Sequence, residues 1–340
     1  MKPPSSSSAA RIAQSAAAHF APLPTLSPNN AAIDTFRTQY FQPQRPVVLP
    51  RGHFSIYPAI DRWFTQHKDG STELNYAYLD KYAADCHVPL ELTSPVPPNG
   101  SSSSSEDTLE NSQTEDPTES FKRFLAPLAL FLQWTRTVTT TTNNNNNSTQ
   151  PRLYLAQCQL LDLPSTLRAD FPTPSFVTDT GKGDIYDTNI WLGIPPTYTP
   201  LHRDPNPNLF VQLAGRKTVR LLAPDEGLGV FRAVRERIGD GVSSRKGDAV
   251  FRGEEMMRGV EREELESAVW GGGGGEEEEQ HPASSSTTTP EPKEKGGTPR
   301  IQGYEATLNA GDAMFIPLGW WHSIKGVGEG VTASVNWWFR

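Results

Sequence analysis

The sequence is poor in cysteine and contains no long apolar run. Its 340 residues include two cysteines, Cys86 and Cys158, which are too few for a disulfide framework and are typical of a reducing compartment. No apolar run approaches the roughly 20 residues that a membrane-spanning helix needs, and nothing near the start resembles a secretory signal. These absences argue against a disulfide-rich secreted protein and against a membrane protein.

We therefore expect a cytoplasmic and/or nuclear location. Residues 1–30 leave mitochondrial targeting open, although Lys2 and Arg11 are their only charged residues and such presequences are rich in arginine. The same segment is rich in Ser, Ala and Pro, which predicts a disordered N-terminal tail.

The sequence also lacks the stripe of basic residues that would indicate binding to duplex nucleic acid. Its formal net charge is −8, but the acids are concentrated in two segments. Residues 101–120 carry six acids and no bases, and residues 271–300 carry six acids and three bases. The acidity therefore belongs to low-complexity sequence and not to a binding face. Nucleic acid is left open as a partner but has no support here.

Glycine and proline are abundant, with 27 and 30 residues, while hydrophobic residues make up 36% of the chain. This mixture predicts an ordered core interrupted by insertions. We expect a single domain over residues 31–340, with low-complexity insertions at about 94–118, 139–150 and 225–300. The last insertion should include a helix over 253–269, whereas 271–297 has Gly and Glu runs that cannot build a core and should be dispensable for folding.

The remaining sequence reads as short strands that follow a helical region. Apolar spacing predicts helices over 31–40, 59–67 and 120–137. Strands are predicted over 45–49, 152–157, 304–308 and 331–338. Short strands bounded by Gly and Pro, with most helices before them, favour a mainly β double-stranded β-helix, or jelly roll, with a helical N-terminal region.

A histidine and an aspartate, His202 and Asp204, stand two residues apart in the stretch Thr-Pro-Leu-His-Arg-Asp. On a strand, positions i and i+2 point to the same side, so the imidazole and the carboxylate would enter one space. Together they form two thirds of the two-histidine, one-carboxylate arrangement that holds non-haem iron(II) with open positions. His322 is the candidate for the third ligand.

The segment that ends in His322 carries its own pattern, which is a Gly, five residues, Pro-x-Gly, two residues and then the histidine. This pattern fits the second cupin motif. Together the two segments resemble a JmjC-domain, cupin-like iron(II)- and 2-oxoglutarate-dependent oxygenase, similar to the small protein hydroxylases related to the asparaginyl hydroxylase that inhibits hypoxia-inducible factor. The resemblance covers about 31–92, 119–224 and 301–340. It implies Fe(II), 2-oxoglutarate as cosubstrate and O2, with His202, Asp204 and His322 as metal ligands and catalytic residues.

Lys217 lies fifteen residues after His202 on a predicted strand face that is otherwise apolar, with Val219 and Leu221. An inward-facing ammonium needs an anionic partner, because an unpaired buried charge is very costly. The resemblance implies that this partner is the distal carboxylate of 2-oxoglutarate. It further implies that Thr199 and Tyr154 bind the same carboxylate, that Asn208 and Asn336 lie near the cosubstrate and the carboxylate ligand, and that Trp338 closes the pocket.

The sequence departs from the pattern in places. Gly326 stands where the general cupin motif has Asn, and Ala156 stands where some relatives have Gln. The last predicted strand ends next to Arg340, so we do not expect the C-terminal helices that dimerise some relatives, and the oligomeric state is left open.

These residues predict a dioxygenase that hydroxylates a protein side chain, with succinate and carbon dioxide as co-products. The partner is then a protein or peptide, and no membrane is expected. Alternatives are a histone lysine demethylase or a tRNA-modifying hydroxylase of the same fold, or a non-enzymatic cupin-like binding module. No zinc-finger reader module is visible, the carboxylate ligand is Asp where many demethylases have Glu, and the full ligand set disfavours a module without activity.

Overall fold

The computed structural model describes residues 19–28, 32–83, 86–95, 119–141, 150–239, 256–257, 259–271 and 301–340. Most of the sequence predicted as insertions lies outside these described residues, as do the first eighteen residues of the predicted tail and all but the first residue of 271–297. None of the helices in the described part combines the length and the apolar character that crossing a bilayer would need.

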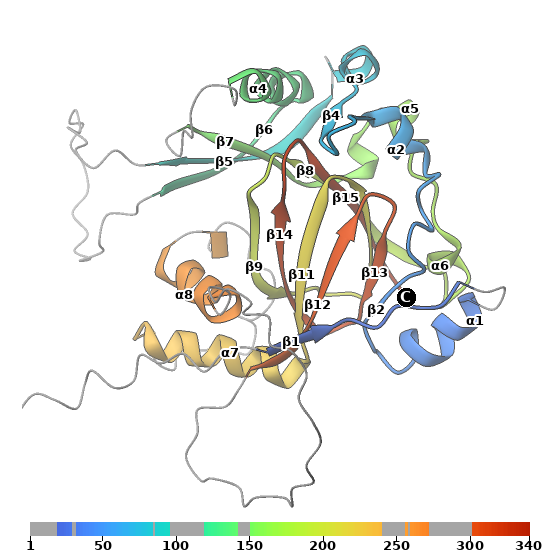
Figure 1. Cartoon of the computed structure of the whole chain (residues 1–340), viewed down its shortest axis with the longest axis vertical. Coiled ribbons are helices and arrows are strands. Elements are labelled where there is room, and N and C mark those ends of the chain that lie inside the picture. The colour runs from blue at the N-terminus through green and yellow to red at the C-terminus, as the bar shows by residue number, and fades with distance from the viewer. Residues whose placement is uncertain are drawn as a thin grey trace, which may run out of the picture.

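Eight strands form a barrel of two facing sheets (Figure 1). In the chain they mostly alternate between the sheets, which is the double-stranded β-helix that the sequence predicts. One sheet contains β9 (Thr197–Arg203), β11 (Arg216–Leu222), β12 (Gln302–Asn309) and β14 (Trp321–Val327). The facing sheet contains β8 (Ile185–Gly193), β10 (Asn208–Ala214), β13 (Ala313–Ile316) and β15 (Thr332–Phe339).

Further strands widen both sheets. The smaller sheet runs β1-β12-β11-β14-β9 and the larger runs β2-β13-β10-β15-β8-β7-β5-β6. The added strands are β1 (His19–Pro22), β2 (Val47–Val48), β5 (His87–Pro95), β6 (Glu119–Pro127) and β7 (Arg152–Gln159), and β3 (Phe64–Gln66) pairs separately with β4 (Thr72–Leu74). The strands predicted over 45–49, 152–157, 304–308 and 331–338 are thus confirmed.

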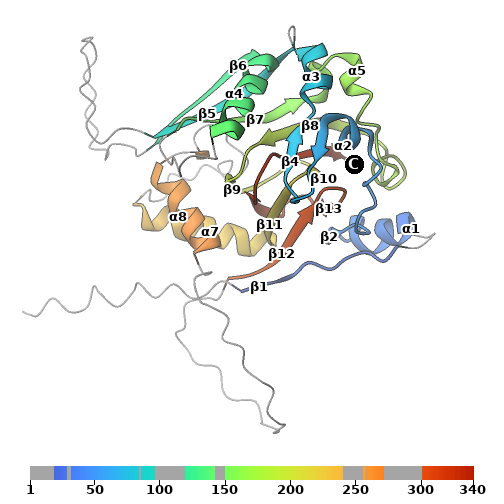
Figure 2. The same cartoon turned by 45° about the horizontal axis from the view of Figure 1, so that its top comes forward.

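Helices cover the barrel on two sides (Figure 2). Helices α3 and α4 lie over the β5–β7 end of the larger sheet, and α7 and α8 lie together beside β9 and β1. Helix bounds are α1 (Ala32–Phe36), continued as a π-helix (Arg37–Phe41), α2 (Pro58–Trp63), α3 (Tyr76–Ala83), α4 (Leu128–Thr141), α5 (Ser165–Arg168), α6 (Ser175–Thr178), α7 (Pro224–Arg237) and α8 (Gly259–Trp270), with a short 3-10 turn at Leu160–Asp162.

Two predicted helices are partly wrong. The segment 120–137 divides into strand β6, which pairs with β5 along its whole length, and helix α4. The break comes at Pro127, which suits the start of a helix but not its interior. Likewise, the helix predicted over 59–67 ends at Trp63, and Phe64–Gln66 pairs with β4. In both cases pairing with a neighbouring strand overrides the apolar spacing.

The prediction that residues 1–30 form a disordered tail is wrong for residues 19–22, because they form strand β1, which pairs in parallel with β12. Arg220 on β11 holds this strand in place. Its guanidinium lies 4.5 Å from the ring centre of Phe20 and 4.4 Å from that of Trp270. Its Nε lies 2.6 Å from Glu305 Oε2. The arginine therefore joins β1 and the last residue of α8 to the smaller sheet.

The described part of the 225–300 insertion adds to the core. α8 confirms the helix predicted over 253–269 from residue 259 onwards. Helices α7 and α8 bury Phe231, Val234, Leu265 and Val269 in a cluster with Leu201, Leu222 and Trp321. A Cβ on Gly227 would meet Trp321 at 2.1 Å, so α7 packs directly on this ring. Strands β11 and β12, which flank the insertion, are antiparallel neighbours, with Leu221 opposite Tyr304.

A buried carboxylate ties the N-terminal helices to the segment between β7 and β8. Asp170 is fully buried and accepts hydrogen bonds from Trp63 Nε1 at 2.9 Å and from Tyr78 Oη at 2.7 Å. It also forms an ion pair with Arg62 Nη1 at 2.5 Å. All its partners come from elements far away in the sequence.

Replacing Asp170 with Ala is expected to lower the free energy of unfolding by about 3 kcal/mol, because it leaves buried donors without an acceptor. Urea unfolding measures this change. The matched control is Asp34→Ala, because Asp34 pairs with Arg37 at the surface and exposed ion pairs contribute little. Equal effects of the two substitutions would contradict this role of Asp170.

Candidate metal centre

Two neighbouring strands bring the three predicted ligands together. His202 lies on β9 and His322 on β14, and the antiparallel register places the two histidines directly opposite each other. Asp204 lies two residues after His202 in the sequence, just beyond the end of β9. The Pro-x-Gly turn between β13 and β14, with Gly319 at φ +82°, lets the chain enter β14 just before His322.

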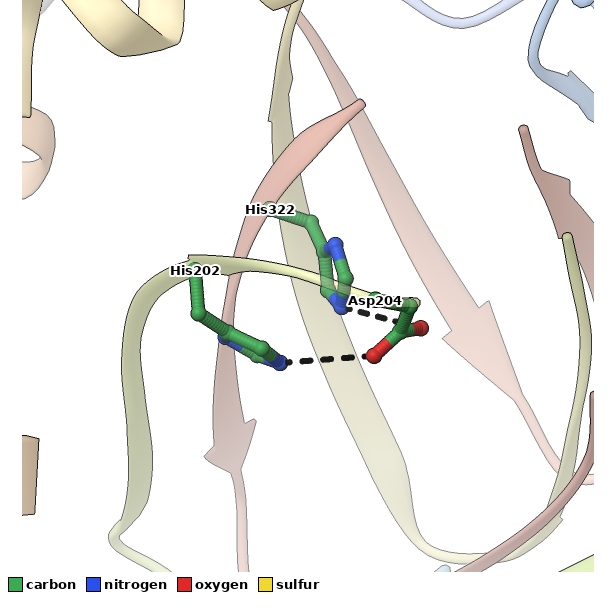
Figure 3. A group of neighbouring side chains, drawn as sticks. All are labelled: His202, Asp204 and His322. Carbon is green, nitrogen blue, oxygen red and sulfur yellow. Dashed lines mark ion pairs between the residues drawn. The ribbon is translucent and has the colours of Figure 1, made fainter. Parts of the chain in front are cut away.

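The three side chains converge on one point (Figure 3). One ligand atom from each lies within 4.8 Å of the others. His202 Nε2 is 3.9 Å from Asp204 Oδ1, and His322 Nε2 is 3.6 Å from Asp204 Oδ2. All three residues are buried. Two imidazoles and one carboxylate in this arrangement are a set that suits a divalent transition metal with open coordination positions.

The other nitrogen of each ring is held by the backbone. His202 Nδ1 lies 2.8 Å from the carbonyl oxygen of Pro200, and His322 Nδ1 lies 3.3 Å from that of Trp320. A carbonyl only accepts, so the proton belongs on Nδ1 and the lone pair of each Nε2 points towards Asp204. Burial, with His322 close by, lowers the pKa of His202, which keeps this ring neutral and able to bind a metal.

Asn208 and Asn336 complete the polar lining of the site. The orientation of each side-chain amide is determined by a partner that can only accept or only donate a hydrogen bond. Asn208 Nδ2 donates to Asp204 Oδ2 at 2.7 Å, and Trp191 Nε1 donates to Asn336 Oδ1 at 2.8 Å. Since a carboxylate only accepts and an indole N–H only donates, neither amide can be reversed. Asn208 Oδ1, Asn336 Nδ2 and Trp338 Nε1 are then buried without a hydrogen-bond partner among the residues that the structure describes. Such atoms fit a polar ligand in the cavity.

Lys217 is the second charged feature of this cavity. It is 2% exposed, its Nζ donates to Ser334 Oγ at 2.7 Å, and it lies 5.5 Å from the ring centre of Phe210. Burial lowers its pKa to about 7. In the described part of the chain no carboxylate pairs with it. A protonated Lys217 is therefore best satisfied by an anion that enters the cavity.

All nine residues predicted for the site line one cavity together with three others. The nine are Tyr154, Thr199, His202, Asp204, Asn208, Lys217, His322, Asn336 and Trp338. Sequence reasoning missed Trp191, Phe210 and Ile324, and it missed Ser334 as the partner of Lys217. The period of two along a strand would have found two of them, because Phe210 follows Asn208 and Ile324 follows His322 by two residues.

The departures from the family pattern have local explanations. A Cβ on Gly326 would lie 2.3 Å from Thr197 Oγ1 and 3.0 Å from Thr332 Cγ2, so the Asn of the general cupin motif has no room here. Ala156 is buried on β7 and is not among the residues that line the cavity.

The position of Tyr154 depends on a glycine in the neighbouring strand. A Cβ on Gly193 would meet the Tyr154 ring at 2.3 Å, so the tyrosine can lie across β8 because this residue has no side chain.

Comparisons with known proteins agree with this geometry. The family described as "Cupin-like domain" matches residues 33–340. The chain is 28% identical over 190 residues to Lysine-specific demethylase JMJ30 of Arabidopsis thaliana, covering 56% of this chain and 35% of the relative. It is 23% identical over 312 residues to Lysine-specific demethylase 8 of Xenopus tropicalis, covering 91% and 51%. It is 21% identical over 335 residues to Jumonji C domain-containing protein 5 of Drosophila melanogaster, covering 94% and 64%. The chain thus spans about a third to two thirds of the length of these relatives.

Proposed function

The chain belongs to the family of cupin-like domains, and on that premise we propose that it is an iron(II)- and 2-oxoglutarate-dependent dioxygenase that hydroxylates a protein side chain. The observation that carries the proposal is the buried Lys217 in the same cavity as His202, Asp204 and His322. A structural metal site would have no use for a buried ammonium without a carboxylate, whereas a dicarboxylate cosubstrate would satisfy it.

In this proposal the two histidine Nε2 atoms and the Asp204 carboxylate hold iron(II). The donor set, the burial and the backbone-held Nδ1 atoms support it. When bound, iron(II) and 2-oxoglutarate supply oxygen activation, in which O2 is consumed, succinate and carbon dioxide are released, and one oxygen atom is added to a C–H bond. Asn208 keeps the carboxylate of Asp204 in position through its 2.7 Å hydrogen bond.

The residues around Lys217 then bind the cosubstrate. Lys217 would neutralise the distal carboxylate, and Thr199 and Tyr154, which line the same cavity, would donate hydroxyl hydrogen bonds to it. Burial raises the pKa of the Tyr154 phenol, so this group stays a donor throughout the physiological range. Asn336 Nδ2 is available to donate to the cosubstrate, because Trp191 donates to Oδ1 of the same amide and so fixes its orientation. Phe210, Ile324 and Trp338 limit the access of water.

A second candidate, lysine demethylation, is favoured by the names of two of the relatives. Both reactions oxidise a C–H bond and differ in the substrate group that faces the metal. Asp204 as the carboxylate ligand, and a fifteen-residue spacing between His202 and Lys217, resemble the small protein hydroxylases, so we favour hydroxylation of a side-chain carbon.

The test is to incubate the protein with iron(II), 2-oxoglutarate and cell-extract proteins under isotopically labelled oxygen gas. Mass spectrometry should find the label in a stable hydroxylated residue, together with succinate. The His322→Ala protein provides the background. Release of formaldehyde from methylated histone peptides, without any labelled residue, would establish demethylation instead, and no succinate in either assay would contradict oxygenase activity altogether.

A further inference from the structure

A second cleft, of about 310 Å³, lies beside the metal cavity and shares Tyr154 with it. One wall comes from strands β5, β6 and β7 of the larger sheet, and the floor includes residues 194–198 and 325–327. The opposite wall comes from α8 and its approach, which belong to the insertion between β11 and β12. Because Tyr154 lines both spaces, an occupant of the cleft that contacts Tyr154 has that part next to the metal cavity.

Of the described residues that line the cleft, five are charged, and three of these already have partners. Lys325 Nζ lies 2.6 Å from Glu266 Oε1, so this pair is neutral as a whole. Glu91 is 7% exposed and is engaged within the chain. Counted together, the described lining residues include three basic and two acidic side chains, so their formal net charge is positive.

Two arginines, Arg152 on β7 and Arg262 on α8, are different. Arg152 Nη1 lies 3.4 Å from the carbonyl oxygen of Pro196, and the Arg262 guanidinium lies 5.1 Å from the ring centre of Tyr198. Among the described residues neither arginine pairs with a carboxylate. Since Pro196 and Tyr198 are only two residues apart, the two guanidinium groups, from opposite walls, approach the same short segment of the cleft.

We propose that this cleft binds an extended segment of the protein substrate, and that Arg152 and Arg262 select an acidic side chain in it. The inference rests on the proposed function, which places the oxidised residue at the metal. A guanidinium binds a carboxylate through two parallel hydrogen bonds, and a stack on an aromatic ring leaves its edge available for this. With three basic and two acidic side chains among its described lining residues, the cleft presents a net positive charge to the segment. Arg262 is a specificity-determining residue supplied by the insertion.

The experiment selects a degenerate peptide library on the immobilised protein, loaded with iron(II) and 2-oxoglutarate in the absence of oxygen so that no turnover occurs. Sequencing of the bound peptides should show Asp and Glu enriched over Lys and Arg by about tenfold at one position, as expected for a charge-assisted pair. Arg262→Glu should reverse this preference, and Arg152→Glu should weaken or reverse it. Arg232→Glu is the matched control, because Arg232 is exposed on the neighbouring helix α7 and does not line the cleft.

Three results would overturn the proposal. These are enrichment of basic residues by the wild-type protein, no charge preference at any position, or the same change in preference for Arg232→Glu as for Arg262→Glu. Iron and 2-oxoglutarate binding, measured on the same samples, separate the two proposals. Their absence from the wild-type protein would contradict the proposed function, whereas their presence without acidic selection would contradict only the role of the arginines. Circular dichroism and the melting temperature of each variant verify that it is folded.

Discussion

Replacing His322 with Ala is expected to abolish both iron binding and turnover of 2-oxoglutarate. His322 lies directly opposite His202 and 3.6 Å from Asp204, so its imidazole is one third of the candidate coordination set. Groups that only support metal ligands contribute about 10- to 100-fold in affinity, and the loss of a ligand itself should exceed this. Metal content after dialysis and succinate formation measure the two losses.

His67→Ala is the matched control, because His67 also lies close to a carboxylate, 3.2 Å from Glu73, but at the surface. His322→Gln keeps more of the buried volume and serves where the Ala variant is unstable. Full iron occupancy in a folded His322 variant would show that the metal is held elsewhere, and the assignment of all three ligands would then fail.

Replacing Lys217 with Ala should raise the 2-oxoglutarate concentration needed for half-maximal turnover by about tenfold to a hundredfold, the equivalent of one charge-assisted contact of about 1.5–3 kcal/mol. Iron should still bind, because Lys217 is not among the three candidate ligands. Lys182→Ala, which changes an exposed lysine, is the control. An unchanged 2-oxoglutarate requirement in Lys217→Ala would place the cosubstrate in another part of the cavity.

The same lysine gives the affinity for 2-oxoglutarate a pH dependence of definite sign. Burial lowers the pKa of Lys217 to about 7, whereas pairing with a carboxylate raises it again. Above pH 7 binding must therefore take up a proton, and affinity should fall by up to about tenfold per pH unit as the pH rises. Below pH 7 the lysine is already charged and contributes no dependence. Isothermal titration across this range measures the effect, which Lys217→Arg should remove because arginine stays charged.

The metal-ligand set could be predicted in part because residues that lie close together in the sequence already show which side chains share one face of a strand. A strand places residues two apart on one side, so His202 and Asp204, and Lys217 with Val219 and Leu221, are readable without any tertiary information. The distance between His322 and His202 in the sequence hides their pairing, and only the resemblance to the cupin motif joined them. Trp191 was not predicted as a site residue because its role depends on Asn336, which reaches it from the neighbouring strand β15.

The secondary structure was less predictable where tertiary pairing decides it. The apolar residues of 120–137 have helical spacing on both sides of Pro127, yet the first half pairs with β5. By contrast, α7 carries local signals, with Pro224 at its first turn, Asp225 and Glu226 next to it, and Arg235 and Arg237 in its last turn.

Strands β11 and β12 pair with each other although residues 223–301 separate them in the sequence. The protein could therefore be divided into two fragments within this segment. A break in the chain at that point would leave His202, Asp204 and Lys217 on one fragment and His322 on the other. Each fragment would carry strands of both barrel sheets, so their reassociation would rebuild the cavity across a noncovalent boundary. The three candidate metal ligands would then be brought together only in the reassociated pair. A split protein divided within this insertion would therefore report, through metal binding, whether two proteins fused to its fragments associate.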